Sequence, residues 1–132
     1  MALVIRTLHR NQKPELLNDE WLLVENTGPG VVNAQGCAVT VARGPNDRPR
    51  PLGTLDPGFV LHPNEKIRLV TGTPSKKSQG EPPDEKGVKN YHLFLREPLL
   101  AKPGVVVRLA LNQLELARAV WKPDAPNGIA EG

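Results

Sequence analysis

Turn-forming residues cut this chain into short segments and leave little room for helices. The sequence holds 14 prolines and 12 glycines in 132 residues, and ten of the prolines fall between Pro45 and Pro103. Inside a helix, a proline removes a backbone hydrogen bond and its ring collides with the preceding turn. Turn signals such as Lys102-Pro103-Gly104 separate short apolar runs, and this spacing is typical of an all-β sandwich or barrel. We therefore expect an all-β fold.

Eight short apolar runs are the expected strands. They cover residues 3–8, 20–26, 31–33, 37–43, 66–70, 91–95, 105–111 and 114–120. In the fourth run Cys37 alternates with Val39 and Val41, and a period of two places one face of a strand in the core. We therefore expect Cys37 to be buried, where an unpaired cysteine behaves as a small hydrophobic residue. Residues 109–121 also contain good helix formers, but Asn112-Gln113 falls where a hairpin turn would lie and slightly favours two strands.

Two segments carry too little apolar surface to join a core. Val88 is the single large apolar residue of segment 71–90, so burial cannot offset the entropy lost on ordering that segment. We expect a long flexible loop there that bridges two strands, and a flexible C-terminal tail at 123–132. Residues 1–122 have the right size for a single domain that needs neither a disulfide nor a structural metal.

Composition and motifs exclude several classes of function. A single cysteine excludes an internal disulfide and a cysteine-based zinc site, and the three histidines lack the spacing of metal ligands. The sequence contains no GxSxG, GxGxxG or Walker A motif. We therefore expect a non-enzymatic protein with no catalytic residues, no metal and no cofactor. No apolar run approaches the ~20 residues of a membrane span, and the N-terminal residues are untypical of a secretory signal, so we expect a cytoplasmic protein without membrane contact.

Three stretches follow a pattern that one family of small β domains shares. Residues 18–28 contain a glutamate, an aromatic residue, alternating aliphatic residues and then Asn-x-Gly. Residues 31–39 contain aliphatic residues, an asparagine, a spacer and a glycine before Cys37. Residues 61–72 contain Leu-x-Pro-x-Glu, a strand and a further glycine, with Asn64 between the proline and the glutamate. Together these stretches resemble the lamin-tail domain, which usually has tryptophan in place of Cys37 and glycine in place of Asn64.

The resemblance covers most of residues 3–122. A fainter match at 106–120 resembles the last hairpin of the family and favours strands there. The resemblance implies an immunoglobulin-like sandwich of about seven to nine strands. It also implies a scaffolding or attachment role, with the domain accompanying enzymes in bacterial relatives. The chain looks like a bacterial-type, stand-alone member of this family.

Trp21 and Leu23 are the candidate apolar anchor for a partner. In the register that the resemblance implies, Leu22 and Val24 face the core, so Trp21 and Leu23 lie on the opposite face. An aromatic and an aliphatic side chain together on a solvent-facing surface are typical of a protein contact. The alternative is that residues 3–8 or 71–90 cover the pair.

Arg43, Arg48 and Arg50 form a basic loop that is the candidate polar rim of the same interface. The formal net charge is +3, which is too small to indicate a dedicated nucleic-acid binder. The ordinary alternative for such arginines is solvated loop charge.

We expect a non-catalytic interaction or scaffolding module that binds a protein partner through an exposed sheet face, an edge strand or the 71–90 loop. The alternative function is sequence-nonspecific nucleic-acid binding through the basic loops, by contacts to the phosphate backbone. A homodimer stays open, because an exposed apolar patch or an unpaired strand edge invites self-association.

Overall fold

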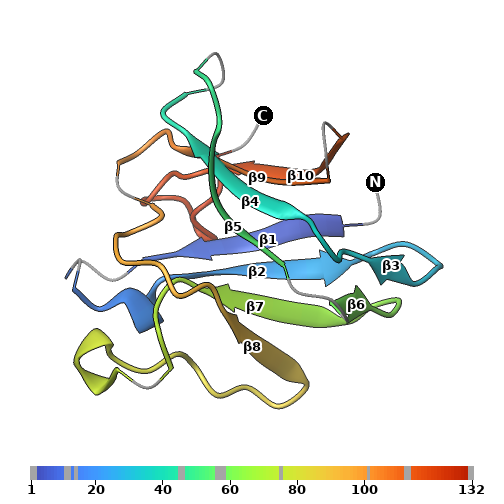
Figure 1. Cartoon of the computed structure of the whole chain (residues 1–132), viewed down its shortest axis with the longest axis horizontal. Helices are drawn as coiled ribbons and strands as arrows, with labels where there is room; N and C mark the ends of the chain where they lie inside the picture. Colours follow the sequence, from blue (N-terminus) through green and yellow to red (C-terminus); the bar gives the residue numbers. More distant parts are fainter. Residues whose placement is uncertain are drawn as a thin grey trace.

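The computed structural model describes residues 3–10, 13, 15–44, 47–55, 59–74, 76–100, 102–111 and 114–130. Ten strands and two short 3-10 helices lie within these residues (Figure 1). The strands are β1 (Leu3–His9), β2 (Trp21–Asn26), β3 (Val32–Asn33), β4 (Ala38–Ala42), β5 (Arg50–Thr54), β6 (Val60–Leu61), β7 (Lys66–Val70), β8 (Val88–His92), β9 (Val106–Leu111) and β10 (Leu114–Val120). The 3-10 helices are η1 (Leu17–Asp19) and η2 (Lys77–Gln79).

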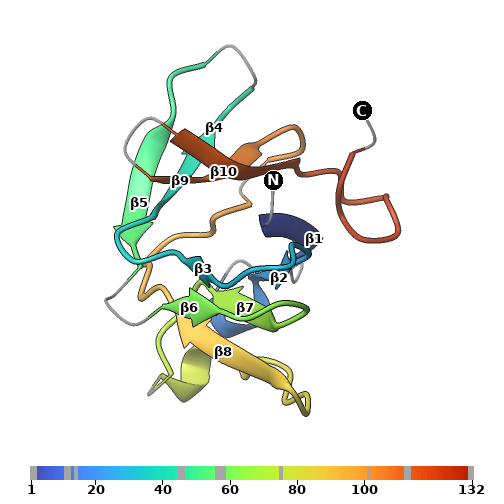
Figure 2. The ribbon, with the colours of Figure 1, turned by 90° about the vertical axis from the view of Figure 1, so that its right-hand side faces the viewer.

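Two four-stranded sheets lie face to face, as Figure 2 shows from the side. One sheet has the strand order β1-β2-β7-β8 and the other has the order β10-β9-β4-β5, while β3 and β6 form a separate two-stranded ribbon. Neighbouring strands run antiparallel except β7 and β8, which are parallel. The prediction of an all-β fold is confirmed. No helix in the described residues is long and apolar enough to cross a membrane.

The core fills the space between the sheets because alternate residues of both sheets point inward. Leu22 and Val24 of β2 are buried, as expected, and Cys37 is buried beside the inward face of β4. Burial also raises the pKa of the Cys37 thiol above its ordinary value. The expected role of Cys37 as a small core residue is confirmed.

Most expected strands are present, with shifts that have physical reasons. The expected bounds hold for β7 and β10, and residues 109–121 form a hairpin of two strands. Asn112-Gln113 lies outside the described residues. The expected strand at 91–95 lies instead at Val88–His92, because β7 supplies partners only from Lys66 to Val70. No strand was expected at β5 or β6. β5 contains Pro51 and Gly53, which it tolerates as the edge strand of its sheet.

Segment 71–90 contains more structure than the expected loop. It bridges β7 and β8, but it includes η2 and the first residues of β8. Asn18 in η1 is buried, and its side-chain NH₂ donates to the carbonyls of Thr73 and Gly80 at 2.9 and 3.0 Å. The expectation of a segment without structure is therefore corrected, because distant buried side chains bind its backbone. Its flexibility stays a prediction.

The described part of the tail, 123–130, folds back on β1. The N–H of Leu8 donates to the carbonyl of Asn127 at 2.9 Å, and Trp121 pairs with Ile129. Gly128 lies in the left-handed region with a φ of 72°, and a Cβ there would lie 2.0 Å from the Leu8 carbonyl oxygen. These contacts attach the tail to the first strand, and its flexibility stays a prediction.

A buried carboxylate joins the first sheet to the segment that crosses to the second. Glu20, directly before β2, is 2% exposed. Its Oε1 accepts hydrogen bonds from the Thr71 hydroxyl at 2.7 Å and from the Leu99 N–H, and its Oε2 accepts one from the Leu100 N–H at 3.1 Å. Burial raises the pKa of Glu20 above its ordinary value, while these donors and the charge of Arg10 act in the opposite direction.

Replacing Glu20 by glutamine should lower the free energy of unfolding by about 1–3 kcal/mol. A glutamine side chain replaces one carboxylate oxygen by an NH₂ group, which cannot accept a hydrogen bond. In one orientation the N–H of Leu100 loses its acceptor, and in the other the N–H of Leu99 and the Thr71 hydroxyl lose theirs. Urea denaturation of the wild type and of Glu20→Gln at neutral pH measures the difference. Equal stability would show that the carboxylate does not hold the crossing segment.

The same pair of proteins tests the direction of the pKa shift. A raised pKa means that the folded chain keeps a proton that the unfolded chain has lost, so the free energy of unfolding falls as the pH rises from the ordinary value of 4.5 through the raised pKa. Because glutamine does not titrate, the stability advantage of the wild type over Glu20→Gln should shrink as the pH rises through this window. A stability advantage that grows with pH would mean that the hydrogen bonds lower the pKa of Glu20 by more than burial raises it.

Replacing Gly128 by alanine should lower the free energy of unfolding by about 3 kcal/mol or more, because backbone strain and a collision with the Leu8 carbonyl add together. Gly87→Ala is a matched control, since Gly87 has a φ of 86° but a Cβ there would meet no atom within 4 Å. Its free energy of unfolding should fall only by the cost of backbone strain, about 1–2 kcal/mol. Equal losses in the two variants would show that the tail does not press against β1.

Candidate functional site

Trp21 and Leu23 lie on the outer face of the β1-β2-β7-β8 sheet, opposite the buried Leu22 and Val24. Both are half-buried rather than free. The Trp21 ring stacks on the His9 ring with 4.9 Å between centroids and 22° between planes. The guanidinium carbon of Arg68 lies 4.6 Å from the centroid of the same Trp21 ring. The two cross-strand neighbours therefore cover much of the indole with contacts of the stacking and cation–π kinds.

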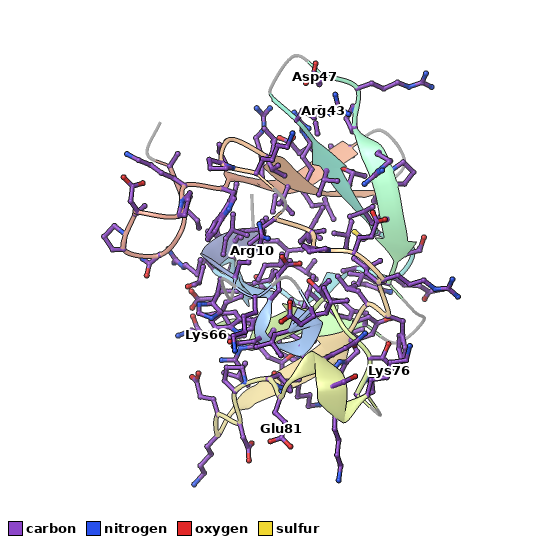
Figure 3. The ribbon with its side chains drawn as sticks, turned by 90° about the vertical axis from the view of Figure 1, so that its left-hand side faces the viewer. Arg10, Arg43, Asp47, Lys66, Lys76 and Glu81 are labelled. Carbon is purple, nitrogen blue, oxygen red and sulfur yellow. The ribbon has the colours of Figure 1, made fainter. Side chains whose placement is uncertain are left out.

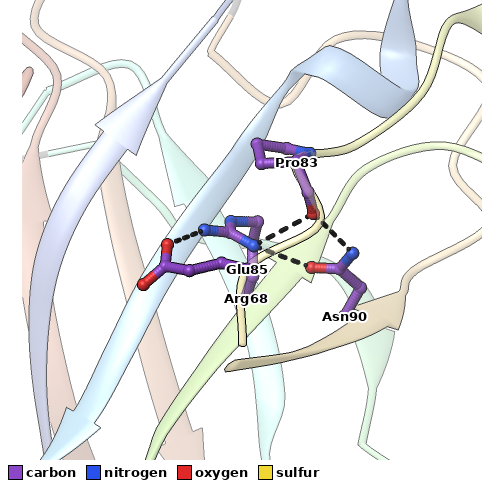
Figure 4. A network of polar contacts seen from close by, with 4 residues as sticks. All are labelled: Arg68, Pro83, Glu85 and Asn90. Carbon is purple, nitrogen blue, oxygen red and sulfur yellow. Dashed lines mark hydrogen bonds and ion pairs between the residues drawn. The ribbon is translucent and has the colours of Figure 1, made fainter. Parts of the chain in front are cut away.

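Arg68 holds segment 83–90 against this face of the sheet (Figure 4). Its side chain is 3% exposed, and its Nη2 lies 2.9 Å from Oε1 of Glu85. Its Nη1 donates to the Pro83 carbonyl at 3.3 Å and to Oδ1 of Asn90 at 3.0 Å. The contacts on Trp21 thus come from His9 and Arg68, and not directly from residues 3–8 or 71–90, which were the alternative covers; segment 83–90 contacts Arg68. A role of Trp21 and Leu23 in partner binding stays a prediction.

The three arginines of the predicted polar rim meet at one groove on the other sheet. Its walls are the hairpin between β4 and β5 and the segment that leads into β9, and its volume is about 590 Å³. Figure 3 shows Arg43 and Asp47 at one end of the molecule, apart from Lys66 and Lys76. The groove is lined by Val41, Ala42, Arg43, Asp47, Arg48, Arg50, Pro98, Leu99, Lys102, Pro103 and Val105.

Lys102 is a groove residue that the sequence analysis missed. It lies in the turn that precedes β9, while the arginines lie in the hairpin between β4 and β5. Pairing of β4 with β9, which aligns Ala42 with Val106, brings these two distant segments together. The Lys102-Pro103-Gly104 turn is visible in the sequence, but no local pattern indicates which hairpin it faces.

In the described residues the groove cations have no carboxylate partner, whereas four other arginines each have one. In the described part of the chain, Arg6, Arg68, Arg108 and Arg118 each form an ion pair with a glutamate. Within those same residues, no ion pair or hydrogen bond involves the side chains of Arg43, Arg48, Arg50 and Lys102. With Asp47 they give the groove a formal charge of +3, which equals the net charge of the whole chain. Like charges around one groove repel each other, and an anion in the groove would be attracted by all four cations.

The floor of the groove is apolar. Val41 of β4, Leu99 and Val105 line it, and all three are buried in the core. A bound group could therefore place an apolar side chain on the floor while its negative charges meet the rim. This combination resembles the hydrophobic centre and polar rim of protein interfaces.

Other chemistry finds less support in the described residues. Across those ranges, no group of three or more His, Cys, Asp and Glu side chains could hold a metal ion. His9 stacks on Trp21, His62 is exposed, and Nδ1 of His92 lies 3.1 Å from the Gly72 carbonyl oxygen. No protein-family model matches the sequence, and no curated protein matches it. The groove is therefore the candidate site on the strength of its own side chains.

The double substitution Trp21→Ser with Leu23→Ser should lower the free energy of unfolding by about 2–4 kcal/mol. The reason is that Trp21 loses its contacts with His9 and Arg68. Urea denaturation measures the loss. The control is Val31→Ser with Leu114→Ser, because both residues are exposed. This double substitution should change the free energy of unfolding by no more than about 0.5 kcal/mol. If the two double variants are equally stable, Trp21 and Leu23 form a free surface after all.

Proposed function

We propose that this chain is a non-catalytic protein-interaction module whose contact surface is the basic groove, and that its partner is an acidic protein segment. The observation that carries the proposal is the meeting of Arg43, Arg48, Arg50 and Lys102 around one cavity, none with an ion-pair partner in the described residues. Cations without internal partners interact with anions from outside at little cost, because no internal ion pair has to break.

The kinds of cation present, and the size of the groove, fit carboxylates on a peptide. The planar guanidinium group of arginine matches a carboxylate with two parallel hydrogen bonds. A volume of about 590 Å³ lies within the usual range of ligand pockets, roughly 300–1,000 Å³, so a few side chains fit. The apolar floor beneath the rim adds room for an aliphatic side chain between acidic residues.

Nucleic-acid binding is the second candidate, since arginine and lysine also contact phosphates. Single-stranded nucleic acids are usually held by stacking of bases on aromatic side chains. No aromatic side chain is among the described residues that line the groove. This composition favours the acidic protein segment over the nucleic acid.

A lamin-tail-like, scaffolding character is part of the same proposal, and two observations support it. The orders β1-β2-β7 and β10-β9-β4-β5 correspond to the A-B-E and G-F-C-C′ arrangement of immunoglobulin-like sandwiches, although β8 runs parallel at the edge where such folds have strand D. Asn64, which stands where the family has glycine, has a φ of 66°, a conformation that glycine and asparagine adopt most readily.

The proposal predicts that the triple substitution of Arg43, Arg48 and Arg50 by glutamate lowers the affinity for poly-L-glutamate by at least about tenfold. Each reversal replaces an attraction by a repulsion at the groove. Isothermal titration at about 0.15 M salt measures the affinity, and the affinity of the wild type should fall as salt is added.

The control is the triple substitution of Lys76, Lys77 and Lys86 by glutamate. It changes the net charge equally, but these exposed lysines do not line the groove. Circular dichroism must show that both triple variants fold. If the two variants lose affinity equally, net charge and not the groove binds the probe. If a single-stranded oligonucleotide of equal charge displaces poly-L-glutamate, the nucleic-acid function replaces the proposed one.

A further inference from the structure

Phe94 is held outward in a backbone conformation that a bulky residue rarely adopts. It is 62% exposed, and its φ is 57°. A left-handed φ costs free energy for any residue with a Cβ, and for a bulky residue it is a true outlier. Asn64 is the other described non-glycine residue with a positive φ, and asparagine tolerates this conformation well. Folding alone would therefore favour glycine or asparagine at position 94.

Hydrogen bonds on both sides fix the outward direction of Phe94. The N–H of Leu93 donates to the Val70 carbonyl at 2.7 Å, and the N–H of Leu95 donates to the Thr71 carbonyl at 2.8 Å. Leu93 and Leu95 pack against the core, so the residue between them has to point away from it. The His92 ring lies 6.5 Å from the Phe94 ring and is the described ring nearest to it.

The segment that follows β8 and carries Phe94 leads into the wall of the groove. Pro98 and Leu99 line the groove, and four residues of chain span at most roughly 14 Å. Thr71, which binds Leu95, also donates through its hydroxyl to Glu20, and Glu20 holds the N–H of Leu99. One carboxylate thus fixes both the backbone beside Phe94 and the groove wall.

We propose that Phe94 is the second contact point for the acidic segment that occupies the groove, and that it binds an aromatic side chain of that segment. This inference rests on the proposed function. An exposed aromatic ring gains most by packing on another ring, and aromatic residues dominate the binding energy of protein interfaces. The segment that fits has acidic residues for the arginine rim and an aromatic residue a few positions away.

The test compares two probes, poly-L-glutamate and a random copolymer of glutamate and tyrosine, in titrations with the wild type and with Phe94→Asn. The wild type should bind the copolymer about tenfold more tightly than poly-L-glutamate. Phe94→Asn should lose this preference and keep its affinity for poly-L-glutamate. Its melting temperature should not fall, because asparagine adopts the positive φ with less strain than phenylalanine.

Leu114→Asn is the matched control. Leu114 is 60% exposed and lies at the opposite end of the β9–β10 hairpin from the groove, so its substitution should leave both affinities unchanged. Equal losses in Phe94→Asn and Leu114→Asn would overturn the inference, since exposed apolar surface in general would then explain the preference. An unchanged preference in Phe94→Asn would overturn it too, with the groove unaffected. If the wild type binds neither probe, the proposed function itself fails.

Discussion

The carboxylate of Glu20 is the contact on which the position of the groove wall depends. It lies before β2, binds Thr71 just after β7, and accepts the backbone N–H groups of Leu99 and Leu100. A segment that leaves one sheet for the other has no strand partner for its backbone, so a buried acceptor has to replace the sheet. Because these bonds lie in the core, the crossing segment has one position. That position sets the wall of the groove.

The local sequence pattern predicts which residues face the core but not which distant segments meet. Alternation placed Cys37 correctly, since a period of two needs no knowledge of neighbours, and the register implied by the resemblance placed Leu22 and Val24 correctly. The bounds of β8 depend on where β7 ends, and the anchoring of segment 71–90 depends on Asn18 and on Arg68. None of these partners is adjacent in the sequence. The low apolar content of 71–90 indicated correctly that the segment buries little hydrophobic surface. Hydrogen bonds from Asn18 and Arg68 hold its backbone instead.

The candidate sites show the same difference between local patterns, which the sequence predicts, and contacts between distant segments, which it does not. The register put Trp21 on the outer face correctly, yet the exposure of Trp21 depends on His9 of β1 and Arg68 of β7. The three arginines were found together because the hairpin between β4 and β5 keeps them close in sequence. Lys102 joins them only through the pairing of β4 with β9. A local cluster is therefore predictable from the sequence, whereas a cluster completed by sheet pairing is not.

The distribution of carboxylates is what distinguishes the groove, as the proposed contact surface, from the sheet faces. On the faces, Arg6 pairs with Glu25 and Arg108 pairs with Glu115, so each of these cations has a carboxylate partner within the fold. Around the groove four cations accompany a single acidic residue, Asp47. Mutual repulsion there opposes folding slightly, and Arg43, Arg48 and Arg50 are exposed, so they add little to the packing of the core. The proposed anion site therefore combines cations that have no internal partners with a wall that the buried Glu20 holds in place, and a rigid site loses less entropy on binding.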